Sequence, residues 1–334
     1  MNFISTADVT GKELASILSA ATLGKKQGWK PKLKGKTVGL LFFNPSLRTR
    51  TSFQAGLIKL GSVPIALSAT DSWALELIDG SIMDGSTAEH VKDAARVLST
   101  YLDAICIRSF PGMKDWDDDK KDALIQGFAK HATVPVINME SCLWHPCQAL
   151  ADALTMQEVL GKTKGKTFVL SWANHPRQLP MAVPNSALLI AAQMGMNVRL
   201  ACPKGYELDS DILNQVKQTA VKQGGSFSTH NDQAEAFKGA QIIYAKSWTP
   251  PVLVGKPDED TKLRKKLSWT ITKEKMAMTN NAAFMHCLPV RRNVVVTDEV
   301  LDSKQSVIIQ QAENRMHSQN ALLLKLLGGK SKSK

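Results

Sequence analysis

Short apolar runs alternate along the chain with longer amphipathic segments, and this alternation constrains the fold more than any other feature. In the first half, four apolar runs are typical of buried strands, and they cover residues 37–43, 63–68, 103–108 and 134–139. The segments between them place apolar residues at helical spacing. Strands that alternate with amphipathic helices indicate parallel βαβ units.

The same pattern restarts after a predicted long helix at residues 145–161. Further strands are predicted at 166–172, 197–203, 241–248 and 283–290, with helices at 185–195, 208–225 and 310–329. We therefore predict an α/β chain with two doubly wound parallel-sheet domains, residues 1–144 with the C-terminal segment 310–334, and residues 145–309. Ligands of such sheets bind at the carboxyl ends of strands, so we expect a site in the cleft between the domains.

The formal net charge of +12 over 334 residues suggests an anionic partner, either a nucleic acid or a small anionic substrate. Part of the excess lies in the terminal "KSKSK", and the rest is dispersed among acidic residues. Because no basic helix or aromatic-interleaved basic stripe is present, we expect a small anionic substrate and no nucleic acid.

Other compositional features argue against a membrane protein and a metalloprotein. No apolar run approaches the ~20 residues that span a bilayer, and residues 1–14 do not resemble a signal peptide. We expect a cytoplasmic protein without membrane contact. The five cysteines are scattered and lack the spacing of a zinc site, so we expect reduced thiols and no metal.

The stretch "FFNPSLRTRTSF" at residues 42–53 combines a strand end, hydroxyl residues and two arginines. A helix is predicted to begin at about Thr51, which places Arg48 and Arg50 at its positive end. Cations are disfavoured there unless an anion compensates them. Free backbone N–H groups, hydroxyls and a guanidinium group would together form an anion site, without the Walker pattern. The alternative is an exposed turn with incidental charges.

Two further positions follow predicted strands. Arg108 closes a strand and either points into the cleft or pairs at the surface with Asp103. In "HPCQ", His145 precedes a helix whose dipole would keep the imidazole neutral. His145 and Gln148, one turn apart, could bind a carbonyl oxygen and an amide. The alternative is a simple helix cap.

A third polar stretch, "HCLPVRRN" at residues 286–293, follows an apolar strand. Cys287 could act as a nucleophile, as a ligand, or only through its backbone. No Cys–His–acid arrangement lies at a recognisable spacing, so covalent catalysis is not expected. Pro289 stiffens the turn and exposes the neighbouring carbonyl groups.

These three stretches together resemble a known family. Residues 42–53 are similar to the carbamoyl-phosphate motif of the transcarbamoylases, and "HPCQ" and "HCLP" resemble two signatures of the ornithine-type members. They occur in the family's order, so the resemblance covers almost the whole chain. It implies transfer of a carbamoyl group from carbamoyl phosphate to an amine, with no cofactor, metal, nucleotide or covalent intermediate.

The chain lacks the DxxxSMG segment of ornithine carbamoyltransferases. Instead, "WANHPRQLPMAVPNS" and "YAKSW" resemble the branch that acts on Nα-acylated ornithine, in the pathway of arginine biosynthesis. The resemblance implies a trefoil knot in the second domain, with Pro176, Pro180 and Pro184 in the threaded loop. It also implies a homotrimer, in which Trp73 reaches into the active site of the neighbouring subunit.

The resemblance assigns residues to two substrates. The catalytic and carbamoyl-phosphate positions are Ser46, Leu47 (through its backbone), Arg48, Thr49, Trp73, Arg108, His145, Gln148, Cys287, Leu288 and Arg315. The acylornithine positions are Ala88, Glu140, His175, Arg177, Lys246 and Arg291. Lys246 and Arg291 are suitable partners for the α-carboxylate. The general base is left open, and the departing phosphate is one candidate.

Two positions bear on the acyl group. In "DGSTAEH", a capping box is predicted with Ser86 at the N-cap and Glu89 at N3, so that Ala88 lies in the first helical turn. The resemblance implies that the acetylornithine branch carries glutamate at Ala88 and a carboxylated lysine at Val295. A glutamate would repel a succinyl carboxylate, so both departures favour N-succinyl-L-ornithine, with Arg177 meeting the extra carboxylate. N-acetyl-L-ornithine is the alternative.

Two other classes of protein fit the sequence less well. A Rossmann dehydrogenase needs G-x-G-x-x-G after a strand and an acidic residue ~20 positions later, and neither is present. A non-catalytic anion- or RNA-binding homologue would show substitutions in the arginine-rich stretch or in "HPCQ", yet both are intact.

Overall fold

The computed structural model describes residues 1–68 and 74–328, which form two compact units. Unit 1 contains Met1–Pro111, Asp117–Cys147 and the segment from Arg315 onward, and unit 2 contains Gly112–Trp116 and Gln148–Asn314. Both are built on parallel sheets flanked by helices, as the alternating pattern predicted. No described helix is long and apolar enough to cross a bilayer.

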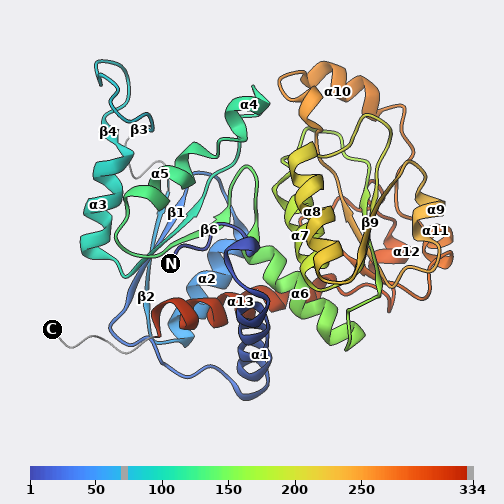
Figure 1. Cartoon of the computed structure of the whole chain (residues 1–334), viewed down its shortest axis with the longest axis horizontal. Coiled ribbons are helices and arrows are strands. Elements are labelled where there is room, and N and C mark those ends of the chain that lie inside the picture. The colour runs from blue at the N-terminus through green and yellow to red at the C-terminus, as the bar shows by residue number, and fades with distance from the viewer. Residues whose placement is uncertain (69–73, 329–334) are drawn as a thin grey trace. The chain divides into compact units, whose positions relative to one another are not determined.

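Unit 1 holds a four-stranded parallel sheet in the order β2-β1-β5-β6. The strands are β1 (Thr37–Phe42), β2 (Val63–Ser68), β5 (Ala104–Arg108) and β6 (Val136–Glu140). Helices α3 (Val91–Tyr101) and α5 (Ala123–His131) cover one face, and α1 (Gly11–Gln27) and α2 (Leu47–Lys59) lie on the other (Figure 1). The smaller elements are η1 (Thr6–Asp8), β3 (Leu75–Glu76), β4 (Glu89–His90) and α4 (Trp116–Asp119).

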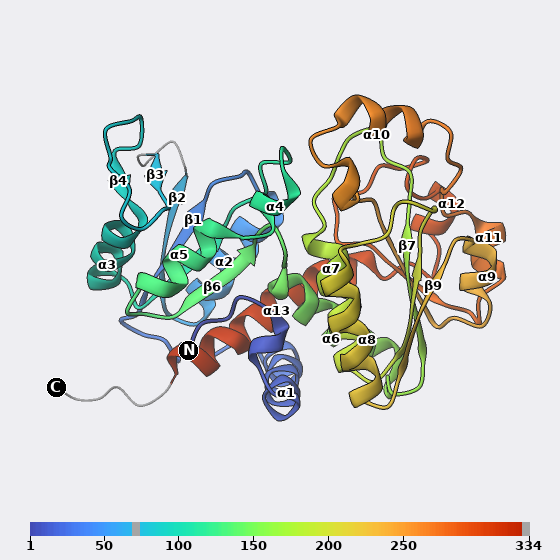
Figure 2. The ribbon, with the colours of Figure 1, turned by 45° about the horizontal axis from the view of Figure 1, so that its top comes forward.

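Unit 2 holds a five-stranded parallel sheet in the order β11-β10-β7-β8-β9. The strands are β7 (Thr167–Trp172), β8 (Asn197–Ala201), β9 (Ser226–His230), β10 (Ile242–Lys246) and β11 (Ala283–Met285). Helices α7 (Ala182–Gln193) and α8 (Ser210–Lys222) cover one face (Figure 2). The other elements are α9 (Gln233–Phe237), η3 (Pro251–Leu253), α10 (Pro257–Arg264), α11 (Lys273–Ala277) and α12 (Asp298–Leu301). The division between the units falls within α6 (Pro146–Leu160) and α13 (Ile308–Leu327).

Two predicted helix starts were wrong. Helix α2 begins at Leu47, four residues before the predicted start, because the Ser46 hydroxyl caps it and accepts the Thr49 N–H (3.2 Å). The predicted capping box at Ser86 does not form. Residues 89–90 instead pair as strand β4, and α3 begins after His90, whose ring nitrogen accepts the Lys92 N–H (3.1 Å).

Two features of unit 2 also differ from the prediction. Helix α7 begins at Ala182, so Pro184 lies in its first turn and not in the preceding loop. Proline is tolerated there because the first N–H groups of a helix have no intrahelical acceptor. Strand β9 was missed because it is a largely exposed edge strand with mostly polar side chains. The trefoil knot stays a prediction.

Candidate functional site

The N-terminus of α2 brings together several of the predicted phosphate-binding groups within unit 1. The Ser46 hydroxyl and the buried Thr49 lie in the cap and first turn. The Thr49 hydroxyl also accepts a hydrogen bond from Arg315 of α13 (3.2 Å), 266 positions away in sequence. Leu47 is the first residue of α2, so its backbone N–H has no acceptor within the helix and is available to an anion. Hydroxyls, first-turn N–H groups and a guanidinium group thus converge on one helix end.

The two arginines of this helix end have different environments. Arg48 is half-buried in the first turn. The Arg50 guanidinium carbon lies 4.4 Å from the centre of the Phe42 ring, and the group donates to the Ser68 hydroxyl (3.2 Å). Arg50 therefore has an aromatic face and a hydroxyl as partners, and the need of this helix end for an anion stays a prediction.

Arg108 and Glu140 form a buried ion pair in unit 1. A register shift between β5 and β6 sets the two residues opposite each other, and the carboxylate also lies 3.4 Å from His145 Nε2. Asp103 pairs with Lys36 (2.7 Å), which removes the surface partner considered for Arg108. Arg108, Glu140 and His145 are all at least nine-tenths buried. Glu140, assigned by the resemblance to the acylornithine, thus contacts two carbamoyl-phosphate candidates.

The loop that presents His145 is held by Asp122, which the sequence analysis missed. The Asp122 carboxylate accepts the Ser141 hydroxyl and the Cys142 N–H (3.0 Å), and Asn138 donates to the Trp144 carbonyl (3.2 Å). Burial raises the pKa of Asp122 above its usual value. Its residue type and position in the sequence carry no signal of this role, because its partners are nineteen or more positions away.

Gln148 lies in unit 2, where its side-chain amide donates to Asp152 one turn later in α6 (2.8 Å). His145 directly precedes Pro146, the first residue of α6. The "HPCQ" stretch therefore opens a helix, in agreement with the sequence pattern.

Three acylornithine candidates follow neighbouring strands of the unit 2 sheet. His175 follows β7, Lys246 ends β10, and Arg291 follows β11. The Arg291 Nε–H donates to His175 Nε2 (3.0 Å), and His175 Nδ1 lies 3.0 Å from the Arg177 carbonyl oxygen.

The His175 imidazole is neutral over a wide pH range. Burial lowers its pKa to about 4, and the nearby charges of Lys246 and Arg291 act in the same direction. Two cations and a neutral imidazole at the ends of adjacent strands are suited to a carboxylate ligand.

The turn after β11 has an unusual backbone. Leu288 adopts a left-handed φ of 58°, its N–H donates to His286 Nδ1 (2.9 Å), and the Leu288–Pro289 bond is cis. Cys287 is half-buried, whereas the other four cysteines are buried. A non-glycine residue held at positive φ is often functional, and it favours use of the backbone here.

The remaining candidates differ in their exposure. Arg177 and Ala88 are exposed, and the Ala88 N–H donates to the Ala74 carbonyl (3.1 Å). Val295 is 2% exposed in the apolar core of unit 2. Trp73 lies outside the described residues.

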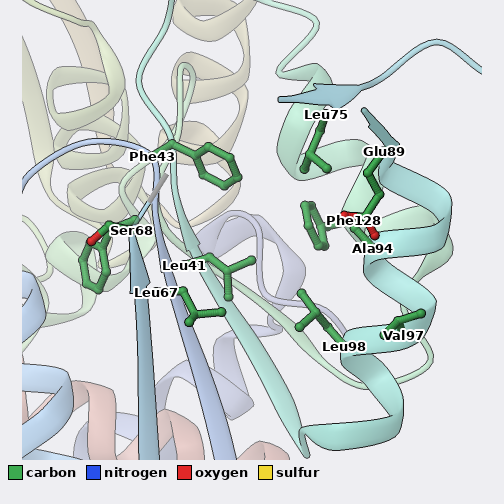
Figure 3. Close-up of a pocket in the computed structure, with 11 residues that line it drawn as sticks. Leu41, Phe43, Leu67, Ser68, Leu75, Glu89, Ala94, Val97, Leu98 and Phe128 are labelled. Atoms are coloured by element: carbon green, nitrogen blue, oxygen red, sulfur yellow. The ribbon is translucent and has the colours of Figure 1, made fainter. Parts of the chain in front are cut away.

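Unit 1 also contains an apolar cavity of about 230 Å³ beside β1, β2 and α3 (Figure 3). Leu41, Leu67, Leu98 and Phe128 line it, and Glu89 is the one charged residue among the described residues of its lining. It contains none of the predicted site residues and is unsuited to a dianion. Among the described residues, no group of three His, Cys, Asp or Glu side chains could hold a metal ion.

Two family models match the chain. Residues 1–158 match the model described as "Aspartate/ornithine carbamoyltransferase, carbamoyl-P binding domain", and residues 181–326 match its "Asp/Orn binding domain". Together they cover both units.

Two of the similar proteins are named for acylated ornithines. The chain is 44% identical to the N-acetylornithine carbamoyltransferase of Xanthomonas campestris pv. campestris, with 98% of each chain covered. It is 39% identical to the N-succinylornithine carbamoyltransferase of Bacteroides thetaiotaomicron, with 89% of each covered.

A solved structure shares the fold, with a TM-score of 0.95 and 44% identity over 98% of this chain and 99% of the other. It is an N-acetyl-L-ornithine transcarbamylase in which one glutamate is replaced by alanine, complexed with carbamyl phosphate and N-succinyl-L-norvaline.

Proposed function

The chain belongs to the aspartate/ornithine carbamoyltransferase family, and from that premise we propose that it carbamoylates the δ-amine of an Nα-acylated ornithine. The reaction forms a C–N bond at the carbonyl carbon of carbamoyl phosphate, breaks the C–O bond to the phosphate, and releases phosphate. The product is an acylated citrulline, and we assign the reaction to arginine biosynthesis.

The observation that carries this proposal is the anion site at the start of α2. The first-turn N–H groups, Ser46, Thr49 and Arg315 suit a phosphate whose charge grows as it departs. Arg108 and His145 are the donors for the developing oxyanion, each in contact with Glu140. We retain Arg48, Trp73, Gln148, Cys287 and Leu288 as further carbamoyl-phosphate positions.

In unit 2, the cluster of His175, Lys246 and Arg291 supports recognition of the acceptor's carboxylate. A neutral His175 adds a hydrogen-bonding group without repelling the neighbouring cations. Much of the rate would come from alignment of the neutral amine with the carbonyl group. The amine loses a proton as its new C–N bond forms. The departing phosphate is a suitable acceptor for that proton.

The identity of the acyl group has two candidates. The comparisons favour N-acetyl-L-ornithine, because identity and coverage are higher for the N-acetylornithine enzymes than for the N-succinylornithine enzymes. This reverses the preference drawn from the sequence. One specific observation still favours N-succinyl-L-ornithine, namely alanine at position 88. In the solved relative, one glutamate is replaced by alanine and the bound ligand is N-succinyl-L-norvaline. We infer that Ala88 occupies the position of that glutamate.

Steady-state kinetics with carbamoyl phosphate and N-acetyl-, N-succinyl- or unmodified L-ornithine test this proposal by colorimetric detection of the ureido product. We expect a higher kcat/KM for N-acetyl-L-ornithine, and Arg48→Ala should abolish product with every acceptor. Absence of product with all three acceptors would contradict the proposed function.

The variant Ala88→Glu distinguishes the two acyl groups. Glutamate should lower kcat/KM for N-succinyl-L-ornithine by about 10-fold or more through like-charge repulsion, and leave N-acetyl-L-ornithine little changed. If the wild type prefers N-succinyl-L-ornithine and Ala88→Glu reverses that preference, N-succinyl-L-ornithine is the acceptor.

A further inference from the structure

A buried ion pair in unit 2 has no part in the chemistry described so far. Asp260 is fully buried and Arg264 is 4% exposed, and the Arg264 Nε–H donates to Asp260 Oδ1 (2.8 Å). The two residues lie four positions apart on α10, a spacing that in sequence is typical of a solvated helix surface. Their burial means that the guanidinium group must find its other acceptors inside the protein.

Those acceptors all lie in the segment that follows Lys246. Arg264 donates from one terminal nitrogen to the Ser247 hydroxyl (2.7 Å), and from the other to the Trp248 carbonyl (2.7 Å) and the Thr249 hydroxyl (3.1 Å). Three consecutive residues are thereby fixed by one planar group. Lys246, the proposed partner of the acceptor's carboxylate, directly precedes them at the end of β10.

Thr249 connects this segment to a second loop of the proposed acceptor site. Its hydroxyl donates to Asp260 Oδ2 (3.0 Å) and accepts the Leu179 N–H (3.2 Å), while its own N–H donates to the Leu179 carbonyl (2.9 Å). Leu179 follows His175 and Arg177 in the loop after β7. The same buried pair therefore holds the loops after β7 and β10 together.

Aromatic side chains enclose the pair. The Arg264 guanidinium carbon lies 5.3 Å from the centre of the Trp172 ring and 5.6 Å from that of Tyr206. The Tyr206 hydroxyl donates to Asp260 Oδ1 (2.7 Å), and the Trp172 indole donates to the Trp248 carbonyl (3.0 Å). Because these groups are buried, their hydrogen bonds are stronger than they would be in water, and they restrict the geometry of the loop.

We propose that Arg264, oriented by Asp260, is a positioning residue for acceptor recognition. It acts through the Ser247–Thr249 segment on Lys246, and through Thr249 on the loop that carries His175. The inference rests on the proposed function, because Lys246 and His175 are assigned to the acylornithine. A lysine at position 264 would keep the positive charge and lose the planar arrangement of donors.

The test is the steady-state kinetics of the full-length Arg264→Lys protein. We expect KM for the acylornithine to rise about 10- to 100-fold, the size expected when positioning groups are displaced, while KM for carbamoyl phosphate stays unchanged. The matched control is Arg199→Lys. Arg199 donates to the carbonyl groups of Ala236 (2.9 Å) and Lys238 (2.8 Å), away from both loops, and its replacement should change neither KM.

A second variant, Thr249→Val, keeps the side-chain shape and removes the hydroxyl that joins the loops. It should raise the acceptor KM selectively, in the same direction as Arg264→Lys. If the wild type is active and both variants raise the two KM values equally, raise neither, or unfold, the positioning role is wrong. A wild type without product from any acylornithine would instead refute the proposed function.

Discussion

At the scale of single residues, the structure separates groups that look alike in sequence. Arg48 and Arg50 lie two positions apart, yet Arg50 contacts the Phe42 ring and the Ser68 hydroxyl, whereas Arg48 is half-buried in the first turn of α2. Arg264 looks like a surface cation in the sequence and is among the most buried charges of unit 2. Local sequence specifies the residue type, and tertiary contacts decide whether a charge is exposed.

His175 gives a prediction about pH at this scale. Burial lowers its pKa from 6.5 to about 4, so the native state disfavours protonation relative to the unfolded chain. Its contribution to stability is present above pH ~6.5 and is lost as the pH falls toward 4. NMR titration of the His175 ring, assigned through His175→Gln, should give a midpoint near 4. A midpoint at the ordinary value would show that the ring is not desolvated.

At the scale of elements, the register of two strands brings Arg108 and Glu140 together at the end of the unit 1 sheet. The shift between β5 and β6 follows Ile107 and sets Arg108 opposite Glu140. Such irregularities re-aim side chains and are frequent beside active sites. The sequence predicted both strands, but register depends on contacts between strands that are about thirty residues apart.

This pairing predicts the stability of variants. Arg108→Met should cost about 3–5 kcal/mol, because it leaves the buried Glu140 carboxylate without its guanidinium partner. The double variant Arg108→Met/Glu140→Gln should recover most of that loss while remaining inactive. Urea unfolding measures the free energy of unfolding of the single and the double variant. If both variants lose the same free energy of unfolding, the destabilisation does not come from the unpaired Glu140 carboxylate.

The helix ends show a related limit. The cap of α2 depends on Ser46, the residue directly before the helix, so it is a property of the local sequence. The helix nevertheless starts four residues before the predicted position. The predicted cap at Ser86 failed because residues 89–90 instead pair with β3. Propensity motifs compete with strand pairing, and only the tertiary structure decides between them.

At the scale of the whole molecule, we predict a homotrimer whose active sites are shared between subunits. Unit 1 exposes apolar side chains such as Ile58, Val63, Ile78 and Ile82, which contact with another subunit would bury. Analytical ultracentrifugation should give a mass near three times 36.5 kDa. A monomer at micromolar concentration would contradict the prediction.

Mixing two inactive variants tests the shared site directly. Trimers that combine Trp73→Ala subunits with Arg48→Ala subunits should regain part of the activity, because some sites would then receive an intact Trp73 and an intact Arg48. Arg48→Ala mixed with Thr49→Ala is the control, since both changes affect the same α2 cap and leave no intact site.

The sequence by itself determined the class of fold, the two-part organisation, and the three stretches that identify the family, because apolar periodicity and short motifs are local properties. It did not determine the Arg108–Glu140 register, the Asp122 contacts behind His145, or the Arg264–Asp260 pair behind Lys246. Each of these joins residues that are brought together only when strands pair and side chains become buried, and the energy of a buried charge depends on all of its neighbours.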